Sequence, residues 1–139
     1  MIAAGVCGSF KVELLKGIHN LLADQFFIAL YTDLANLTRD TTSYVTDGEI
    51  SGPGYTAGGL EMQQPRVLGP SAAAAYATWD DPVWPNSTLI ARAALIYNKT
   101  KQQRSVAVLD FVSDQASNVG DFRVHLPTPG PATALIRIG

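Results

Sequence analysis

The stretch Ser87–Val112, STLIARAALIYNKTKQQRSVAVLDFV, decides the fold. It consists of two apolar runs joined by the polar segment Lys99–Gln103. Apolar runs that flank a short polar turn predict a β-hairpin. Both faces of each run are apolar, which is typical of central strands that are covered on both sides. We therefore expect a buried hairpin at the centre of a sheet.

Outside the hairpin tip Lys99–Arg104, Arg92 and Asp110 are the only charged residues of this stretch. If the hairpin closes with Asn98 facing Arg104, then Arg92 faces Asp110 directly across the strands. Opposite charges on facing residues stabilise a sheet, whereas a lone charge in an apolar sheet is costly. We therefore predict a structural ion pair, Arg92 with Asp110, that fixes the register. An active-site role for this pair is the alternative.

The rest of the chain predicts one helix and several short strands. Phe10, Leu14 and Ile18 recur at helical spacing, which indicates a short N-terminal helix at about residues 10–22, with Ser9 as its N-cap. Apolar runs separated by proline or glycine predict strands near residues 26–31, 60–62, 72–79, 122–126 and 134–138. Residues 33–54 form a long polar excursion, and residues 80–85, which contain Pro82 and Pro85, predict a turn.

These elements favour an all-β fold, an antiparallel sandwich or jelly-roll-like arrangement with the one helix at its N-terminal end. Residues 1–8 are small and read as an extended N-terminal arm. Residues 9–139 then form a single β-sandwich domain, and no internal repeat or domain boundary interrupts them.

The composition points to a protein partner rather than to nucleic acid or a membrane. Of the 139 residues, 47% are hydrophobic and only 16% are charged, against roughly 25% charged residues in a typical soluble domain. So few charges suggest that part of the surface is covered by a partner. The net charge of −2 argues against a phosphate-binding surface. No apolar run approaches the roughly 20 residues of a membrane span.

The sequence offers no recognisable catalytic or metal-binding set. It contains no phosphate loop and no GxGxxG, HExxH, GxSxG or CxxC motif. His19 and His125 are far apart in the sequence, and Cys7 is the only cysteine, so a zinc site is not indicated. We therefore expect no cofactor, no metal and no enzymatic activity.

Candidate interface residues come from segments that the core does not explain. The basic hairpin tip, Lys99 to Arg104, is either solvated or docks onto an acidic partner. The arm and the long excursion are the other two segments, and tryptophan and tyrosine are enriched at interfaces. The expected interface set is Ile2, Phe10, Tyr44, Tyr55, Trp84, Lys99, Lys101 and Arg104.

Five segments together resemble a known family. They are SFKVELLKGIHN at Ser9–Asn20, FFIALYT at Phe26–Thr32, GYTAGG at Gly54–Gly59, LIARAALIYN at Leu89–Asn98 and SVAVLDF at Ser105–Phe111. Their order and spacing resemble a family of small structural proteins of tailed bacteriophages, over nearly the whole chain. The GYTAGG turn and the ARAALIYN strand carry most of this resemblance.

The resemblance implies a virion component without enzymatic activity. We expect a capsid decoration (cement) protein, a homo-oligomer (dimer or trimer) that is assembled in the host cytoplasm and binds the phage major capsid protein on the capsid surface. One alternative is a tail, neck or fibre-attachment module. Another is a carbohydrate-binding β-sandwich that uses Trp79, Trp84, Tyr44 and Tyr55 as stacking platforms.

Overall fold

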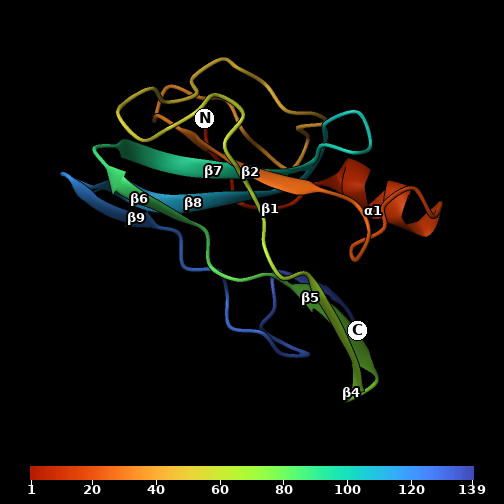
Figure 1. Cartoon of the computed structure of the whole chain (residues 1–139). Coiled ribbons are helices and arrows are strands. Elements are labelled where there is room, and N and C mark those ends of the chain that lie inside the picture. Colours follow the sequence, from red (N-terminus) through yellow and green to blue (C-terminus); the bar gives the residue numbers. More distant parts are fainter.

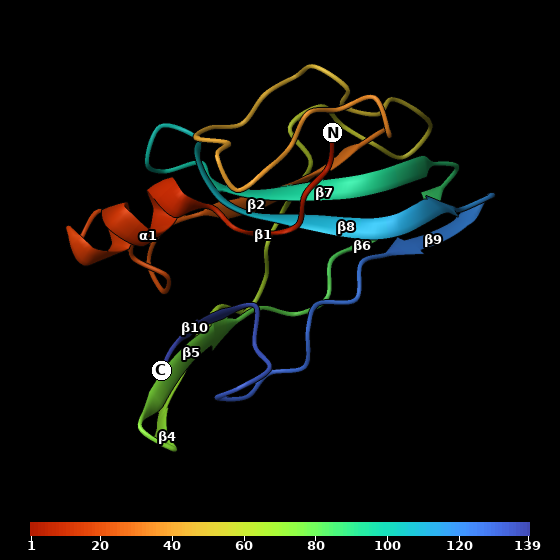
Figure 2. The same ribbon diagram turned by 180° about the vertical axis from the view of Figure 1, so that it is seen from behind.

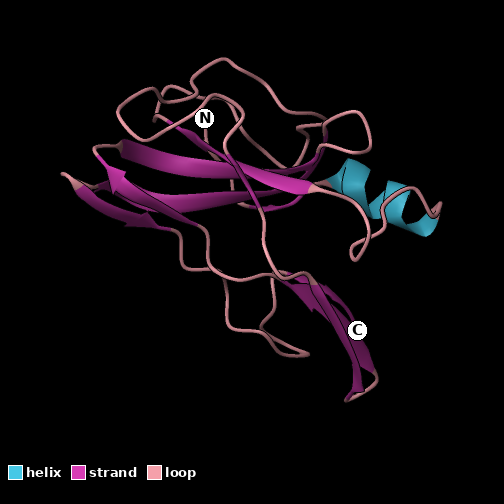
Figure 3. Cartoon of the chain, in the orientation of Figure 1, coloured by secondary structure: helices cyan, strands magenta, loops and turns pink.

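The computed structural model describes residues 1–139 and consists mostly of antiparallel strands with one short helix (Figures 1 and 3). The all-β class with one N-terminal helix is confirmed. The largest sheet has the strand order β1-β8-β7-β2-β3. Its strands are β1 (Gly5–Val6), β2 (Phe26–Tyr31), β3 (Leu60–Glu61), β7 (Ile90–Asn98) and β8 (Arg104–Ala116).

Two smaller sheets complete the fold. The three-stranded sheet, in the order β10-β5-β4, contains β4 (Arg66–Ser71), β5 (Ala74–Thr78) and β10 (Ile136–Ile138). The two-stranded ribbon pairs β6 (Val83–Ser87) with β9 (Gly120–Arg123). This ribbon lies against one side of the large sheet, and residues 33–59 cross the other side (Figures 1 and 2). Such layering is compatible with a sandwich, although one layer has only two strands.

The hairpin of β7 and β8 lies at the centre of the large sheet, as expected. β7 pairs with β2 along the whole length of β2, from Phe26↔Asn98 to Tyr31↔Ala93. Residues 93–98 of β7 are all buried, because the strand has neighbours on both edges and cover on both faces. The buried core comprises 27 residues, most of them from β2, β7 and β8 and the segments packed on them.

The register of this hairpin differs from the predicted one. Asn98 faces Arg104 and Tyr97 faces Ser105, as expected, but Ile96 then faces Ala107 rather than Val106. One additional residue of β8 is accommodated at this irregularity, so the pairs from Ile96 to Ala93 are displaced by one. A second irregularity between Ala91 and Ala93 displaces the last pairs further, so that Ala91 faces Gln115. Ala93, not Arg92, therefore faces Asp110. The prediction assumed a regular ladder and was wrong beyond Tyr97.

The ion pair itself is present but does not fix the register. Arg92 Nε lies 3.5 Å from Asp110 Oδ1, and the two side chains are 31% and 24% exposed. Arg92 Nε has no hydrogen-bond acceptor. Asp110 instead accepts a 2.8 Å hydrogen bond from the backbone N–H of Val112, a residue with φ of 70°. Asp110 thus stabilises the backbone bend in β8, and the pair contributes little.

The helix α1 (Gly8–Leu15) is shorter than predicted and begins earlier. Cys7 is its N-cap, so Ser9 lies inside the first turn. The chain leaves the helix at Gly17, whose φ of +74° is readily adopted only by glycine. The N–H groups of Leu22 and Ala23 donate to the Asn20 side chain and the Asp24 N–H donates to the Asn20 carbonyl, so residues 20–24 form a turn. The apolar spacing had suggested a continuous helix.

Residues 1–8 are part of the domain and not a free arm. Gly5 faces Val108 and Val6 faces Ala107, which makes β1 the edge strand beside β8. The N–H of Ala3 donates to the carbonyl of Leu37 over 2.8 Å, and Cys7 is fully buried. The separate N-terminal arm was therefore a wrong prediction, because small residues suit an edge strand as well as an arm.

Two further segments differ from expectation. The region predicted as a turn at residues 80–85 contains the start of β6, which tolerates Pro85 because β6 has a neighbouring strand, β9, on one side only. The strand β4 was not predicted, since its apolar residues are interrupted by Gly69 and Pro70. The helix α1 has eight residues, and no helix is long and apolar enough to cross a membrane.

Candidate interaction surface

Phe10 and Trp84 belong to the core. Their exposed fractions are 1% and 3%. The ring centroid of Phe10 lies 4.7 Å from that of His19, and Trp84 meets Phe122 edge to face at 6.1 Å. Both were expected at an interface, and that prediction is wrong because the chain buries them itself. Ile2 is half-buried and forms a backbone bridge to Leu37.

Tyr44 and Tyr55 are held by the carboxylate of Glu49. Their hydroxyls donate to Glu49 Oε1 and Oε2, each over 2.5 Å, and the Gly58 N–H donates to Oε2 over 2.8 Å. Hydrogen bonds to an ionised carboxylate are stronger than those between neutral groups. Burial, and after it the hydrogen bond to Glu49, raises the pKa of both tyrosines. Their hydroxyls are therefore committed inside the fold.

The Glu49 cluster fastens the long excursion onto the large sheet. Tyr44 stacks on Tyr97 of β7 with a centroid distance of 4.7 Å, and the Tyr97 hydroxyl donates to the carbonyl of Gly58. Burial and the Glu49 charge raise the pKa of Tyr97 to about 12. Residues 33–59 thus cover the sheet instead of extending from it (Figure 1). With Trp79 3% exposed as well, the four aromatic residues do not form an open stacking platform.

The basic hairpin tip contacts its own chain. Lys101 Nζ lies 3.0 Å from Asp24 Oδ2, and Arg104 Nη1 lies 3.0 Å from Glu13 Oε2. The ammonium group of Lys99 lies 4.5 Å above the centroid of the Phe27 ring, a cation–π contact. Lys101 and Arg104 fasten the hairpin to α1 and the turn after it, and Lys99 contacts β2, so the tip has little free positive charge for a partner.

The side chain of His19 is fully buried. Its Nδ1 lies 2.9 Å from Asn98 Nδ2, and its Nε2 lies 2.8 Å from Glu13 Oε1. An amide nitrogen can only donate, so Nδ1 accepts and Nε2 carries the hydrogen that Glu13 accepts. Both ring nitrogens are thereby occupied. No three acidic, histidine or cysteine side chains gather in a way that could hold a metal ion.

The most exposed regular structure is the three-stranded sheet of β4, β5 and β10, here called the projecting sheet. It extends away from the large sheet in two opposite views (Figures 1 and 2). All six residues of β4 are exposed, and the edge of β4 away from β5 has no neighbouring strand. Val67 is 47% exposed and Leu68 is 41% exposed. Unpaired edges with apolar side chains are sites where another chain can add.

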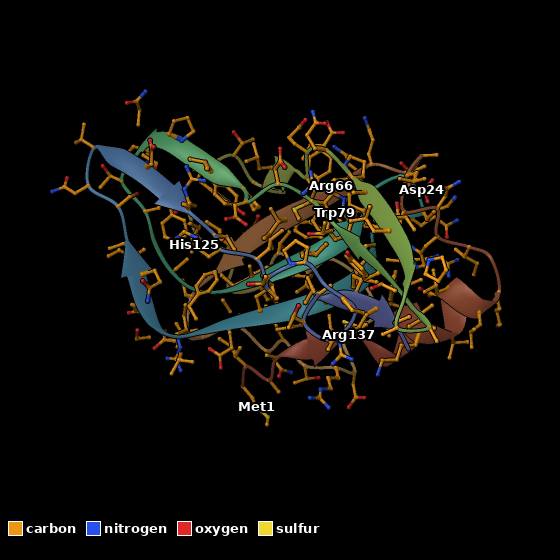
Figure 4. The ribbon with its side chains drawn as sticks, turned by 90° about the horizontal axis from the view of Figure 1, so that it is seen from below. Met1, Asp24, Arg66, Trp79, His125 and Arg137 are labelled. Carbon is orange, nitrogen blue, oxygen red and sulfur yellow. The ribbon has the colours of Figure 1, made fainter.

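Trp79, directly after β5, anchors the base of the projecting sheet. Its ring lies 5.5 Å from that of Phe26 in β2, and Figure 4 shows it between the projecting sheet and the large sheet. Arg66 and Asp80 form an exposed ion pair with a 2.9 Å distance beside it. The anchor fixes one end of the sheet, while the β4–β5 turn at Ala72 and Ala73 lies at the far end.

A groove separates α1 from β10. It has a volume of about 330 Å³. Its apolar walls come from Leu14 and Leu15 on one side and from Ile136 and Ile138 on the other, and Lys11 and Arg137 also line it. A smaller hollow of about 120 Å³ adjoins it, where Leu21 faces Val67 and Tyr76 of the projecting sheet. Apolar walls with cations at the margin suit a protein segment better than a small polar ligand.

Neither the groove nor β4 was predicted from the sequence. The groove joins residues near the two ends of the chain, so no local pattern reveals it. The apolar pair Val67 and Leu68 between two prolines was the one available signal for β4.

The chain is therefore an antiparallel β module with one buried core and an exposed, projecting three-stranded sheet. No family model, no curated protein and no solved structure matches this chain.

Proposed function

We propose that this chain is a non-enzymatic structural protein of a bacteriophage virion. In this proposal it is a capsid decoration protein that binds the outside of the shell built by the major capsid protein. The observation that carries the proposal is the projecting sheet, whose strand β4 is exposed along its whole length. The resemblance of five segments to structural proteins of tailed phages supports the choice of partner.

The chemistry of β4 suits a partner that offers its own strand or an apolar ridge. A free strand edge supplies backbone hydrogen-bond groups, and Val67 and Leu68 supply apolar contact. Natural proteins protect or cover such edges, since exposed edges lead to aggregation. One short strand makes a small contact. A shell offers many equivalent positions, so many such contacts together stabilise it.

The internal contacts of the module fit the same role. The Glu49 cluster and the contacts of Lys101 and Arg104 fasten the long loops to the large sheet. A module with its loops fastened presents the projecting sheet in one orientation. Preorganised surfaces lose less conformational entropy on binding than mobile ones.

The test is co-sedimentation of the purified chain with empty shells of the phage that encodes it. We expect saturable, stoichiometric binding and shells that resist higher temperatures. Leu68→Asp, on the exposed edge strand, should reduce binding at least about tenfold, the effect of placing an unpaired charge in an apolar contact. Leu34→Asp is the matched control, because Leu34 is 86% exposed and lies on the loops that cover the large sheet.

Two outcomes would overturn the proposal. One is a chain that does not bind shells at any concentration. The other is binding that Leu68→Asp and Leu34→Asp leave equally strong, since the projecting sheet would then not be the contact. Binding to a glycan array without any shell present would favour the carbohydrate-binding alternative instead.

A further inference from the structure

The groove between α1 and β10 carries positive charge that the chain does not neutralise. Lys11 and Arg137 line this groove, and neither takes part in an ion pair within the chain. Both residues are exposed. The edge of β10 away from β5 has no neighbouring strand, so backbone groups of Ile136–Ile138 are also available there.

The opposite end of the molecule exposes apolar side chains and two unpaired carboxylates, together with the Arg123 guanidinium. It contains the distal half of β8, residues 109–116, which we call the distal strand. Val112 is 75% exposed, and nearby Ile90 and Val119 are 61% and 80% exposed. Asp114 and Asp121 are exposed and form no ion pair. In Figures 1 and 2 this end lies at the side of the molecule away from α1.

The distal strand also has a free edge. β1 covers β8 only at Ala107 and Val108, so the distal strand has no neighbour on that side of the sheet. One end of the molecule therefore offers an extended apolar strand with carboxylates. The other end offers an apolar groove with a strand edge and cations. The two surfaces complement each other, because each has a free strand edge, both are apolar, and the carboxylates of one can pair with the cations of the other.

We propose that copies of this chain associate head to tail, with the distal strand of one copy in the α1–β10 groove of the next. Val112 enters the apolar groove, and Asp114 lies against Arg137 and Lys11. The distal strand adds to the edge of β10 by backbone hydrogen bonds, which is a known mode of strand addition. A head-to-tail contact generates a ring if the rotation closes.

This inference goes beyond the proposed function and does not depend on it. The contact uses the β10 edge of the projecting sheet, while the proposed shell contact uses the β4 edge on the other side. Leu68→Asp should therefore weaken shell binding without changing self-association, which separates failure of one proposal from failure of the other.

Sedimentation velocity and native mass spectrometry of the full chain, over a range of concentrations, test the contact. We expect the unmodified chain to associate. Arg137→Glu and Asp114→Arg should each weaken association at least about tenfold, because each places like charges opposite one another. Both residues are exposed, so the fold should be kept, and circular dichroism checks this. Arg137→Lys keeps the charge and should keep association. Asp47→Arg, an equal charge change on the exposed covering loops, should have no effect.

Mixing the two charge-reversed variants gives the sharpest result. Each variant alone has charges of the same sign in its groove and on its distal strand. In a mixture, the groove of R137E can take the distal strand of D114R, and the unchanged groove of D114R can take the unchanged distal strand of R137E. We expect the mixture to restore association in assemblies in which the two variants alternate, and closed rings among them should contain only even numbers of copies. A chain carrying both R137E and D114R should associate by itself. The proposal is overturned if the unmodified chain stays monomeric, if neither charge reversal weakens association, or if mixing restores nothing.

Discussion

The buried imidazole of His19 lies 2.9 Å from the side-chain amide of Asn98, 79 residues further along the chain. The same Asn98 nitrogen donates to Asp24 Oδ2 over 2.9 Å, and Asn98 Oδ1 accepts the N–H of Lys101. The Asn98 side chain, at the end of β7, thus forms hydrogen bonds both with the segment that follows α1, at His19 and Asp24, and with the hairpin turn, at Lys101. This is where the N-terminal segment is fastened to the central hairpin.

Asn98→Leu should destabilise the fold by about 2 kcal/mol, because it leaves the buried Nδ1 of His19 without a hydrogen-bond donor. It also removes one of the hydrogen bonds to Asp24, which keeps those from Lys101 and the Asn20 N–H. Urea unfolding measures this loss. Asn36→Leu, at an exposed position, is the control and should change stability by less than about 0.5 kcal/mol. Equal effects of the two substitutions would show that the Asn98 network is not a stabilising element.

Asp24 should make the fold sensitive to acid. Burial alone would raise the pKa of its carboxyl, but hydrogen bonds from the Asn20 N–H, Asn98 and Lys101 outweigh burial and hold the pKa below its usual value. A lowered folded-state pKa means that the ionised carboxylate stabilises the fold above about pH 4, and that this contribution is lost as the pH falls through the folded pKa. The free energy of unfolding of the unmodified chain should therefore exceed that of Asp24→Asn at neutral pH, and the gap should shrink on acidification. A gap that stays constant from neutral to acid pH would contradict this.

The Glu49 cluster should govern the alkaline limit of stability. Burial and then the Glu49 charge raise the pKa of Tyr97 to about 12. A raised folded-state pKa means that stability is complete below about pH 10 and is lost as the pH rises through the folded pKa. Glu49→Gln removes the charge and weakens two strong hydrogen bonds, so we expect tyrosinate absorbance to appear at lower pH and a loss of about 2 kcal/mol in the free energy of unfolding. An unchanged tyrosine titration would show that Glu49 does not act on these hydroxyls.

Arg92→Leu should cost no more than about 1 kcal/mol, since the pair with Asp110 is partly exposed and 3.5 Å apart. Asp110→Ala should cost more, because it also removes the 2.8 Å hydrogen bond to the Val112 N–H at the bend in β8. Chemical denaturation of both variants gives the comparison. If Arg92→Leu proved the more damaging of the two, the ion pair would be the stabilising feature after all.

Local patterns predicted those elements whose residues are contiguous and regular. The strand Phe26–Tyr31 was predicted with its observed bounds, because a short apolar run between two aspartates indicates a buried strand and marks both of its ends. The helix was predicted too long because its apolar spacing continues past Gly17, where the backbone turns. The predicted hairpin register was wrong because it assumed a regular ladder, whereas the pairing of β7 with β8 is irregular next to Ile96 and again between Ala91 and Ala93.

Long-range relationships could not be predicted from one sequence. Tyr44, Tyr55 and Tyr97 converge on Glu49 and Gly58 only after the excursion has folded over the sheet. The cations at the hairpin tip looked free because their partners, Glu13 and Asp24, lie near the other end of the chain. For the same reason, residues expected to meet a partner proved to contact the chain itself.

The proposal of a shell-binding module is tested most directly by the copy number of this chain in purified virions, measured by quantitative mass spectrometry against the major capsid protein. A decoration protein is expected in a fixed, near-stoichiometric ratio to the shell subunits, and therefore in hundreds of copies per particle. A handful of copies would contradict the proposal and point to a tail or neck position, and complete absence from the particle would exclude a structural role in the virion.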